Sequence, residues 1–192
     1  KLKIDYLYIP TFKDIYGFKP KNKIFLDKSS KKLCGKFRKG HFEGVLNVVN
    51  RFIEIIKPRY IFLGKKDYQQ LYLIKKHIEK RKIKSKVIEC KTIRDNNGVA
   101  FSTRNTNLNK HQMKIASNIY FYLYNLKKKM KKNYNLFNIN KIKKDLKYLG
   151  ASKIDYLENY DIKNHKKIKK LNKRFRLFIA YYIKNTRLID NI

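Results

Sequence analysis

The segment from Ile61 to Gln70 constrains the possible folds of this chain more than any other stretch. Four residues, Tyr60 to Leu63, are apolar or aromatic and lead directly into Gly64. Two lysines and an aspartate, Lys65 to Asp67, follow, and an amphipathic segment begins after them. The apolar residues of that segment recur with helical spacing, at Tyr68, Leu71, Tyr72, Ile74 and Ile78. This order predicts a buried strand, a tight turn and a helix, with Asp67 as the helix N-cap.

The predicted turn lies where α/β proteins commonly bind anions. In open α/β sheets, ligands bind beyond the carboxyl ends of the strands, and helix N-termini favour negative charge. Gly64, Lys65 and Lys66 at that place therefore predict a phosphate-binding turn. An ordinary strand-to-helix turn that happens to be basic explains this segment equally well when it is taken alone.

Four segments of the chain together resemble one enzyme family, pantothenate synthetase (pantoate–β-alanine ligase). Residues 64–70 resemble its G-x-K-D-F/Y-Q-Q signature, and residues 38–45 resemble its R-P-G-H-F-x-G-V motif. Residues 94–105 are similar to R-x-x-D-G-L-A-x-S-S-R-N, and residues 186–191 to A-R-L-I-D-N. The order and spacing of the four motifs make the resemblance specific, and it covers essentially the whole chain.

The resemblance implies an ATP-dependent ligation in the pathway to coenzyme A. In this family the carboxylate of (R)-pantoate attacks the α-phosphorus of ATP, which gives pantoyl adenylate and releases pyrophosphate. The amine of β-alanine then attacks the activated acyl group and releases AMP, so that pantothenate forms. Such transfers depend on positioning of the attacking oxygen and on cations near the developing phosphate charge.

The resemblance also assigns roles to residues of this chain. Lys66 and Arg104 are the expected catalytic residues, and Gln70 is the expected pantoate ligand. His41 is expected at the edge of the site, without a chemical step of its own. The residues expected at ATP are Gly64, Lys65, Lys66, Asp67, Ile93, Phe101, Ser102, Thr103 and Arg104. Mg²⁺ is expected with ATP, and no protein ligand for it is identified.

The family's N-terminal motif M-G-x-L-H-x-G-H, whose histidines assist adenylation, has no counterpart in these 192 residues. The chain therefore resembles the C-terminal two-thirds of the family, and it begins within a predicted strand at residues 4–9. Whether this part is active alone is left open. A catalytically decayed relative of the same fold is one alternative, against which the retained motif residues argue.

The predicted fold class is α/β. Residues 60–63, 68–81 and 86–90 predict a strand–helix–strand unit with parallel strands. Residues 1–92 are expected to form the C-terminal part of a Rossmann-like nucleotidylyltransferase domain, incomplete at its N-terminus, which binds ATP and pantoate. Residues 93–192 are expected to form a small α+β lid domain.

Shorter elements are predicted around these units. A short helix or turn is expected at residues 11–17 and a short strand at residues 23–26. In the lid, a turn is expected at residues 95–98. Helices are expected at residues 112–123 and 139–149, the second with Gly150 at its C-terminal cap. Strands are expected at residues 153–158, 174–182 and 187–190, the last two joined as a hairpin. The family has a glycine where this turn has Lys184, and we expect Asn185 to adopt the left-handed conformation instead.

The net charge of +35, from 49 Lys and Arg against 14 Asp and Glu, raises a second alternative. Such an excess is typical of nucleic-acid-binding proteins. However, Lys, Ile, Asn, Tyr and Phe are all abundant, as A/T-rich codons would produce, and lysine runs usually cover solvated faces. We therefore favour compositional drift over a basic RNA-binding protein and expect no specific nucleic-acid partner.

The remaining features fit a cytoplasmic enzyme of small-molecule substrates. No apolar run is long enough for a membrane span, and no secretory signal opens the chain. Cys34 and Cys90 fit no metal-binding spacing, and reduced thiols are expected. The family resemblance also implies a homodimer.

Overall fold

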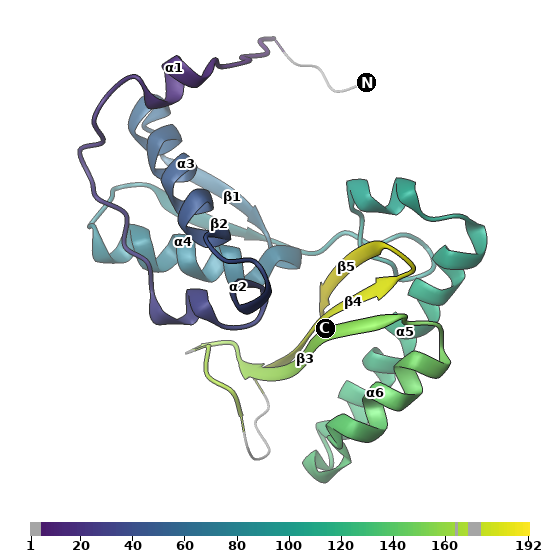
Figure 1. Cartoon of the computed structure of the whole chain (residues 1–192). Coiled ribbons are helices and arrows are strands. Elements are labelled where there is room, and N and C mark those ends of the chain that lie inside the picture. The colour runs from purple at the N-terminus through teal and green to yellow at the C-terminus, as the bar shows by residue number, and fades with distance from the viewer. Residues whose placement is uncertain (1–4, 164, 169–173) are drawn as a thin grey trace.

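A computed structural model describes residues 5–163, 165–168 and 174–192 of the chain (Figure 1). The described part contains one parallel and one antiparallel sheet, with helices packed on each. The helices (η for 3-10 helices) and strands are, in chain order, α1 (Phe12–Tyr16), η1 (Lys28–Lys31), α2 (Cys34–Phe37), α3 (His41–Ile56), β1 (Tyr60–Gly64), η2 (Lys65–Asp67), α4 (Tyr68–Lys80), β2 (Lys86–Cys90), η3 (Thr103–Asn107), α5 (Lys110–Met130), η4 (Tyr134–Leu136), α6 (Ile139–Tyr148), β3 (Lys153–Asp161), β4 (Phe175–Ile183) and β5 (Thr186–Asn191).

The predicted strand–helix–strand unit is confirmed. β1 and β2 pair in parallel, from Tyr60 beside Lys86 to Gly64 beside Cys90, and α4 connects them. The apolar faces of α3 and α4 meet in a cluster that also packs on this sheet. Its fully buried members are Leu46 and Ile74. This packing fixes the carboxyl end of β1, from which the turn at Lys66 emerges.

The antiparallel sheet has the order β3–β4–β5, so β4 is the central strand. One face of β4 packs against α5 and α6, where Ile179 lies in a core with Leu123 and Leu146. The opposite face carries Phe178 and Ala180, which pack in a cluster with α4 residue Tyr68. Residues from helices of both predicted domains therefore pack against this sheet.

Two predicted strands are wrong. The described residues at 5–9 form no strand, and their side chains are exposed, with Tyr6 at 93% and Leu7 at 78%. Residues 23–26 also form none, because the backbone N–H of Phe25 donates to His77 Nδ1 instead of to a strand. Strand residues need a neighbouring backbone to complete their hydrogen bonds, and sequence pattern alone does not supply that partner. Residues 1–4 lie outside the described residues.

The elements of the lid follow the prediction more closely. α5, α6, β3, β4 and β5 all occupy the expected segments, and Gly150 with φ of 110° ends α6 as expected of a helix C-cap. Among the described residues, no helix combines the length and apolar character that crossing a membrane requires.

The hairpin turn between β4 and β5 corrects one expectation. Ile183 pairs with Thr186, and Lys184, not Asn185, has the positive φ of 49°. The left-handed conformation therefore falls on the position where the family has glycine. A side chain there is strained, because its Cβ crowds the backbone.

We expect Lys184→Gly to stabilise the protein. A left-handed residue other than glycine costs about 1–2 kcal/mol, and glycine loses about 0.5–1 kcal/mol in chain entropy. The free energy of unfolding in urea should therefore rise by about 0.5–1 kcal/mol. Lys86→Gly, at an exposed strand position without positive φ, is the control and should lower it. Equal effects of the two changes would contradict the strain at Lys184.

Candidate active site

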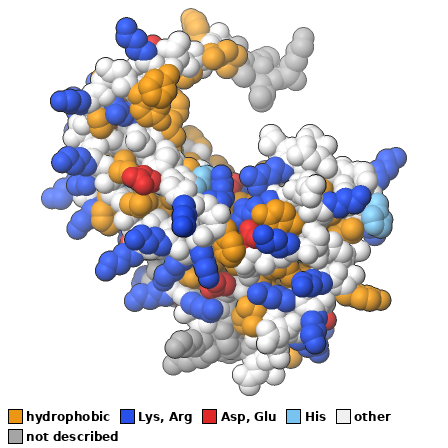
Figure 2. All heavy atoms as spheres, viewed as in Figure 1, with side chains coloured by type: hydrophobic (Ala, Val, Ile, Leu, Met, Phe, Trp, Pro, Cys, Tyr) orange, Lys and Arg blue, Asp and Glu red, His pale blue; other side chains and the backbone are white. Residues whose placement is uncertain are grey.

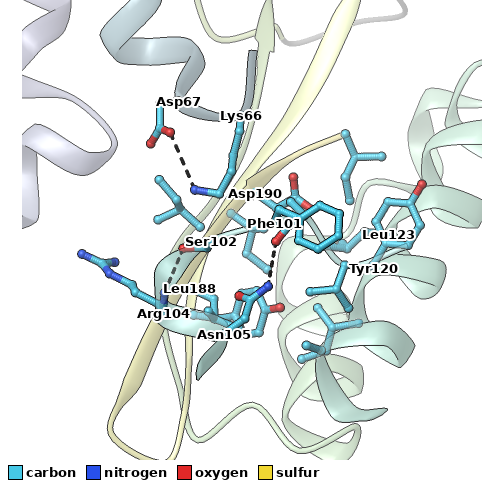
Figure 3. A pocket seen from close by; sticks show the side chains of 18 of the residues that line it. Lys66, Asp67, Phe101, Ser102, Arg104, Asn105, Tyr120, Leu123, Leu188 and Asp190 are labelled. Carbon is cyan, nitrogen blue, oxygen red and sulfur yellow. Dashed lines mark hydrogen bonds and ion pairs between the residues drawn. The ribbon is translucent and has the colours of Figure 1, made fainter. Parts of the chain in front are cut away.

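A cavity of about 370 Å³ lies where η2, η3, α5 and β5 meet. Figure 3 shows Lys66 and Asp67 entering it from η2, and Ser102 and Arg104 lying at the start of η3. The apolar wall comes from α5 and the sheet. Five of the predicted ATP-site residues, besides Lys66, line this cavity or its mouth: Asp67, Phe101, Ser102, Thr103 and Arg104.

The turn after β1 presents one lysine and one carboxylate to the cavity. Residues Lys65–Asp67 form a 3-10 turn before α4, and the side chain of Lys66 is 20% exposed. Asp67 holds the N-cap position of α4, but its side chain makes no capping hydrogen bond, so that part of the prediction is wrong. Its backbone angles, φ −95° and ψ 53°, are not those of an extended N-cap. The carboxylate instead lies 3.7 Å from Lys66 Nζ.

The side chains of the two adjacent lysines of this turn, Lys65 and Lys66, point into different hollows of the protein. Lys65 Nζ lies 3.2 Å from the carboxylate of Glu89, and Lys65 lines a separate groove beside α5. It does not line the cavity that holds Lys66. The structure therefore brings Lys66 to the predicted site and directs Lys65 away from it.

The loop before η3 is shaped by its own side chains. Asp95 Oδ1 accepts the backbone N–H groups of Asn97 and Val99, at 2.9 Å and 2.8 Å, as the turn chemistry predicted. Gly98 has φ of 80°, and a Cβ there would lie 2.2 Å from the Tyr120 ring. Glycine thus lets the loop lie against α5, which forms one wall of the cavity.

The hydroxyl and guanidinium groups of η3 lie at the end of this loop. Ser102 Oγ accepts the backbone N–H of Arg104 at 3.2 Å, and Arg104 Nη1 donates to the Arg187 carbonyl at 3.0 Å. The remaining guanidinium donors of Arg104 can serve an anion. Phe101 is 60% exposed and lies at the mouth of the cavity.

Besides Lys65, two predicted ATP-site residues do not line the cavity. Gly64 ends β1 with open space around its Cα, and Ile93 is 66% exposed. The carbonyl of Ile93 accepts the backbone N–H of Phe101 at 3.1 Å. In this structure Ile93 therefore supports the loop through its backbone.

The neighbouring glutamines Gln69 and Gln70 have different environments. Gln69 is buried, donates to the carbonyls of Ser29 and Lys32 and accepts the N–H of Cys34. Gln70 lines a smaller hollow of about 40 Å³ next to the cavity. Among the described residues, none is hydrogen-bonded to the Gln70 amide, which leaves it able to bind a ligand.

Arg38 is a site residue that the sequence-based assignment missed. It lines both the cavity and the smaller hollow, and its Nη1 lies 2.9 Å from His41 Nε2. Burial and the Arg38 charge lower the pKa of His41, so neutral His41 accepts this hydrogen bond. The R-x-G-H segment carried the signal, since its arginine precedes the helix that begins at His41.

The charges around the cavity leave an excess of cations. Asp190 is held by Arg94 in a two-bond ion pair, at 2.7 Å and 2.9 Å. Arg38, Lys66 and Arg104 all line the cavity, with Asp67 as the only other acidic lining residue in the described part of the chain. Such a cavity is suited to an anion with several charged oxygens.

Asn191 joins the last strand to the turn that carries Lys66. Its Nδ2 donates to the carbonyls of Lys65 and Lys66, at 2.8 Å and 2.7 Å, and its Oδ1 accepts from Arg176. Asn191 is only 3% exposed. These bonds satisfy carbonyls of a 3-10 turn and hold η2 against β5.

The fold and site define an α/β protein with a cation-lined cavity at the carboxyl end of a parallel strand, the place where nucleotide-binding proteins of this class bind their ligands. The profile of the pantoate-beta-alanine ligase family matches residues 1–192. The chain belongs to this family.

Individual relatives agree with this assignment. A pantothenate synthetase of Flavobacterium psychrophilum is 35% identical over 193 residues, which cover 97% of this chain and 67% of the relative. One from Sulfurihydrogenibium sp. is 34% identical and is matched over 100% of this chain and 70% of its own length. The chain thus spans about two-thirds of the length of these relatives.

Solved structures give the same result. A pantoate-beta-alanine ligase from Francisella tularensis, complexed with beta-gamma ATP and beta-alanine, has 35% identity and a TM-score of 0.70 over 94% of this chain and 61% of its own. Pantothenate synthetase from Thermus thermophilus, at 24% identity, shares the fold with a TM-score of 0.85 over 99% of this chain and 70% of its own.

We expect Asn191→Ala to destabilise the protein. Two carbonyls would lose their hydrogen bonds, and each unsatisfied buried polar group costs about 1–3 kcal/mol. The free energy of unfolding, measured by urea denaturation, should fall by about 2 kcal/mol or more.

Asn185→Ala is the control, because Asn185 is exposed in the hairpin turn. It should change the free energy of unfolding by less than about 0.5 kcal/mol. If Asn191→Ala matched this control, the tie between β5 and η2 would contribute nothing to stability.

Proposed function

We propose that this chain carries the ATP and pantoate sites of a pantoate–β-alanine ligase, which forms pantothenate through pantoyl adenylate. The supporting observation is that Lys66 from one family motif and Ser102 and Arg104 from another lie around one cavity. Membership of the family, shown over the whole chain, supports the same conclusion. A basic RNA-binding protein is not favoured.

Lys66 and Arg104 are the proposed catalytic residues. The ammonium of Lys66, whose side chain is 20% exposed at the cavity, would stabilise charge on the phosphate oxygens as the carboxylate of pantoate attacks. Arg104, with the hydroxyls of Ser102 and Thr103, would bind the outer phosphates. Pyrophosphate leaves from these groups, and the amine of β-alanine then attacks the acyl carbon.

Three further assignments concern the nucleotide. The carboxylate of Asp67 is free of helix capping and would accept hydrogen bonds from the ribose hydroxyls. Phe101 would cover the adenine at the mouth of the cavity. Gly64 and Ile93 remain proposed ATP contacts through their backbone, and Lys65 would act only through its charge.

Gln70 is the proposed pantoate ligand. An amide can donate to a carboxylate and accept from a hydroxyl, and pantoate offers both groups. The position of Gln70 in the hollow next to Lys66 and Asp67 supports this. That hollow would place the pantoate carboxylate beside the proposed phosphate site.

Mg²⁺ is proposed as a companion of ATP. In the described residues, no group of three or more His, Cys, Asp or Glu side chains could hold a metal. The ion would therefore be held mainly by phosphate and water. A homodimer and a cytoplasmic location remain predictions from the family.

We expect Lys66→Ala to abolish most ATP- and pantoate-dependent pyrophosphate release. Loss of one such charge should reduce the rate by about 10²–10³-fold. The assay uses the chain alone and joined to the N-terminal third of the Flavobacterium relative, because the relatives are longer.

Lys76→Ala is the matched control. Lys76 lies on α4, the helix that directly follows the turn of Lys66, but it pairs with Glu79 outside the cavity, so the rate should be unchanged. Absence of release from a folded, joined protein would reject the ligase and favour the decayed relative.

Substitution of the adjacent glutamines Gln69 and Gln70 should have different effects, one on the stability of the protein and the other on pantoate binding. Gln70→Ala should raise the KM for pantoate about tenfold while the melting temperature stays unchanged, since about 1.4 kcal/mol of hydrogen bonding is lost only with ligand bound. Gln69→Ala should lower the melting temperature, because two buried hydrogen bonds and one half-buried hydrogen bond are lost. A KM that did not respond to Gln70→Ala would remove this residue from the site.

A further inference from the structure

A second hollow lies beside the candidate active site and carries an unusual set of charges. This cationic groove, of about 460 Å³, runs along α5 and the segment that follows β2. Tyr120 and Ile192 line both this groove and the active-site cavity, so the two are neighbours. The groove contains no acidic lining residue in the described part of the chain. Besides Arg94, its charged residues are Lys65, Lys91, Lys127, Lys128, Lys131 and Arg176.

Most of these cations lack an anionic partner. Lys65 pairs with Glu89, and Arg94 pairs with Asp190. Among the described residues, no carboxylate forms an ion pair with the other five cations of the groove. Lys127 and Lys128 lie in the last turn of α5, and Lys131, the C-cap of α5, follows them by four and three positions, so it lies on the same side of the helix end.

Two of these five cations, Lys127 and Arg176, are half-buried, whereas Lys91, Lys128 and Lys131 are exposed at the rim of the groove. Burial, the Arg176 charge and the Lys131 charge together lower the pKa of Lys127 to about 8. Burial also lowers the pKa of Arg176. Like charges in a concave, partly dry site repel each other, and a bound anion would relieve that repulsion. An ordinary solvated lysine face does not have this arrangement.

The aromatic residues of the groove argue against a stacked nucleobase. The rings of Tyr120 and Tyr124 stack on each other, with centroids 5.8 Å apart. Arg94 lies 4.4 Å from the centre of the Tyr120 ring, and Lys128 lies 4.4 Å from that of Tyr124. Because these ring faces are already engaged, they offer little surface for the base stacking on which single-stranded nucleic-acid binding depends.

We propose that the cationic groove binds a small oligophosphate anion of about the size of pyrophosphate, separately from the nucleotide cavity. Such an anion presents several charged oxygens to a set of cations that have no carboxylate as an ion-pair partner. Its identification with the pyrophosphate released in ligation rests on the proposed function. The groove would then hold the product next to the cavity where it forms.

The test is equilibrium binding of pyrophosphate, by titration calorimetry, without ATP or pantoate. Lys127→Gln with Lys131→Gln should weaken binding about tenfold or more, since two charged hydrogen-bond donors to the anion are lost. Lys141→Gln with Lys144→Gln, on exposed positions of α6, removes the same charge and should change the affinity by less than about twofold.

Further arms of the experiment identify the site. Lys66→Ala should leave pyrophosphate binding in the groove intact. The groove variant, Lys127→Gln with Lys131→Gln, removes repulsion between like charges, so its melting temperature should not fall. Equal loss in the groove and α6 variants would show bulk charge only and overturn the proposal. Loss confined to Lys66→Ala would place the anion in the nucleotide cavity instead.

A single-stranded RNA oligonucleotide tests the rival occupant. RNA binding that requires Lys127 and Lys131 and that pyrophosphate cannot displace would overturn the small-anion proposal in favour of a nucleic-acid groove. RNA binding that is equal in the groove and α6 variants would agree with bulk charge and leave the pyrophosphate site in place. None of these measurements depends on turnover, so failure of the ligase assay would be a separate result.

Discussion

The hydrogen bonds between the Asn191 amide and the carbonyls of Lys65 and Lys66 connect the two halves of the site. Lys66 follows a parallel strand in the first half, and Asn191 ends the last strand of the second. Without this tie, the turn would have two carbonyls without partners and the cavity would lose a fixed wall. The position of the proposed catalytic lysine thus depends on a residue 125 positions away in sequence.

The central strand β4 extends this coupling through apolar contacts. Ile179 faces the helices of the lid, while Phe178 faces Tyr68 of α4, the residue directly after the Lys65–Asp67 turn. Tyr68 also donates its hydroxyl hydrogen to the carbonyl of Ile162 at 2.9 Å. The two predicted domains therefore share buried surface next to the cavity, and a change in their packing would move Lys66 relative to Ser102.

The sequence pattern predicted those helices, strands and turns that are determined by contacts between residues close in the sequence. The strand–helix–strand unit, the Asp95–Gly98 turn and the lid strands all follow from periodicity and turn chemistry, and four motifs together indicated Lys66, Ser102 and Arg104. Two errors are local, at the Asp67 cap and at the Lys184–Asn185 turn. The other features that the sequence did not predict concern partners distant in sequence. Residues 5–9 lack a neighbouring strand among the described residues, Lys65 turns to Glu89, and Gln69 is fixed by the loop at Ser29–Cys34. No sequence spacing distinguishes two adjacent lysines or two adjacent glutamines by such contacts.

The same contacts decide which of the 49 basic residues have a specific role. Figure 2 shows Lys and Arg side chains over much of the visible surface, where solvent and salt screen them. Lys66 differs because it is 20% exposed in a cavity, and Lys127 differs because burial and neighbouring cations lower its pKa. Compositional drift can supply many lysines, but only desolvation in a concave site makes a lysine's charge strong enough to hold an anion against water. The net charge of the chain therefore says little about its binding partners. The burial of each basic side chain, and whether it has an ion-pair partner, distinguish a candidate phosphate site from a solvated basic surface.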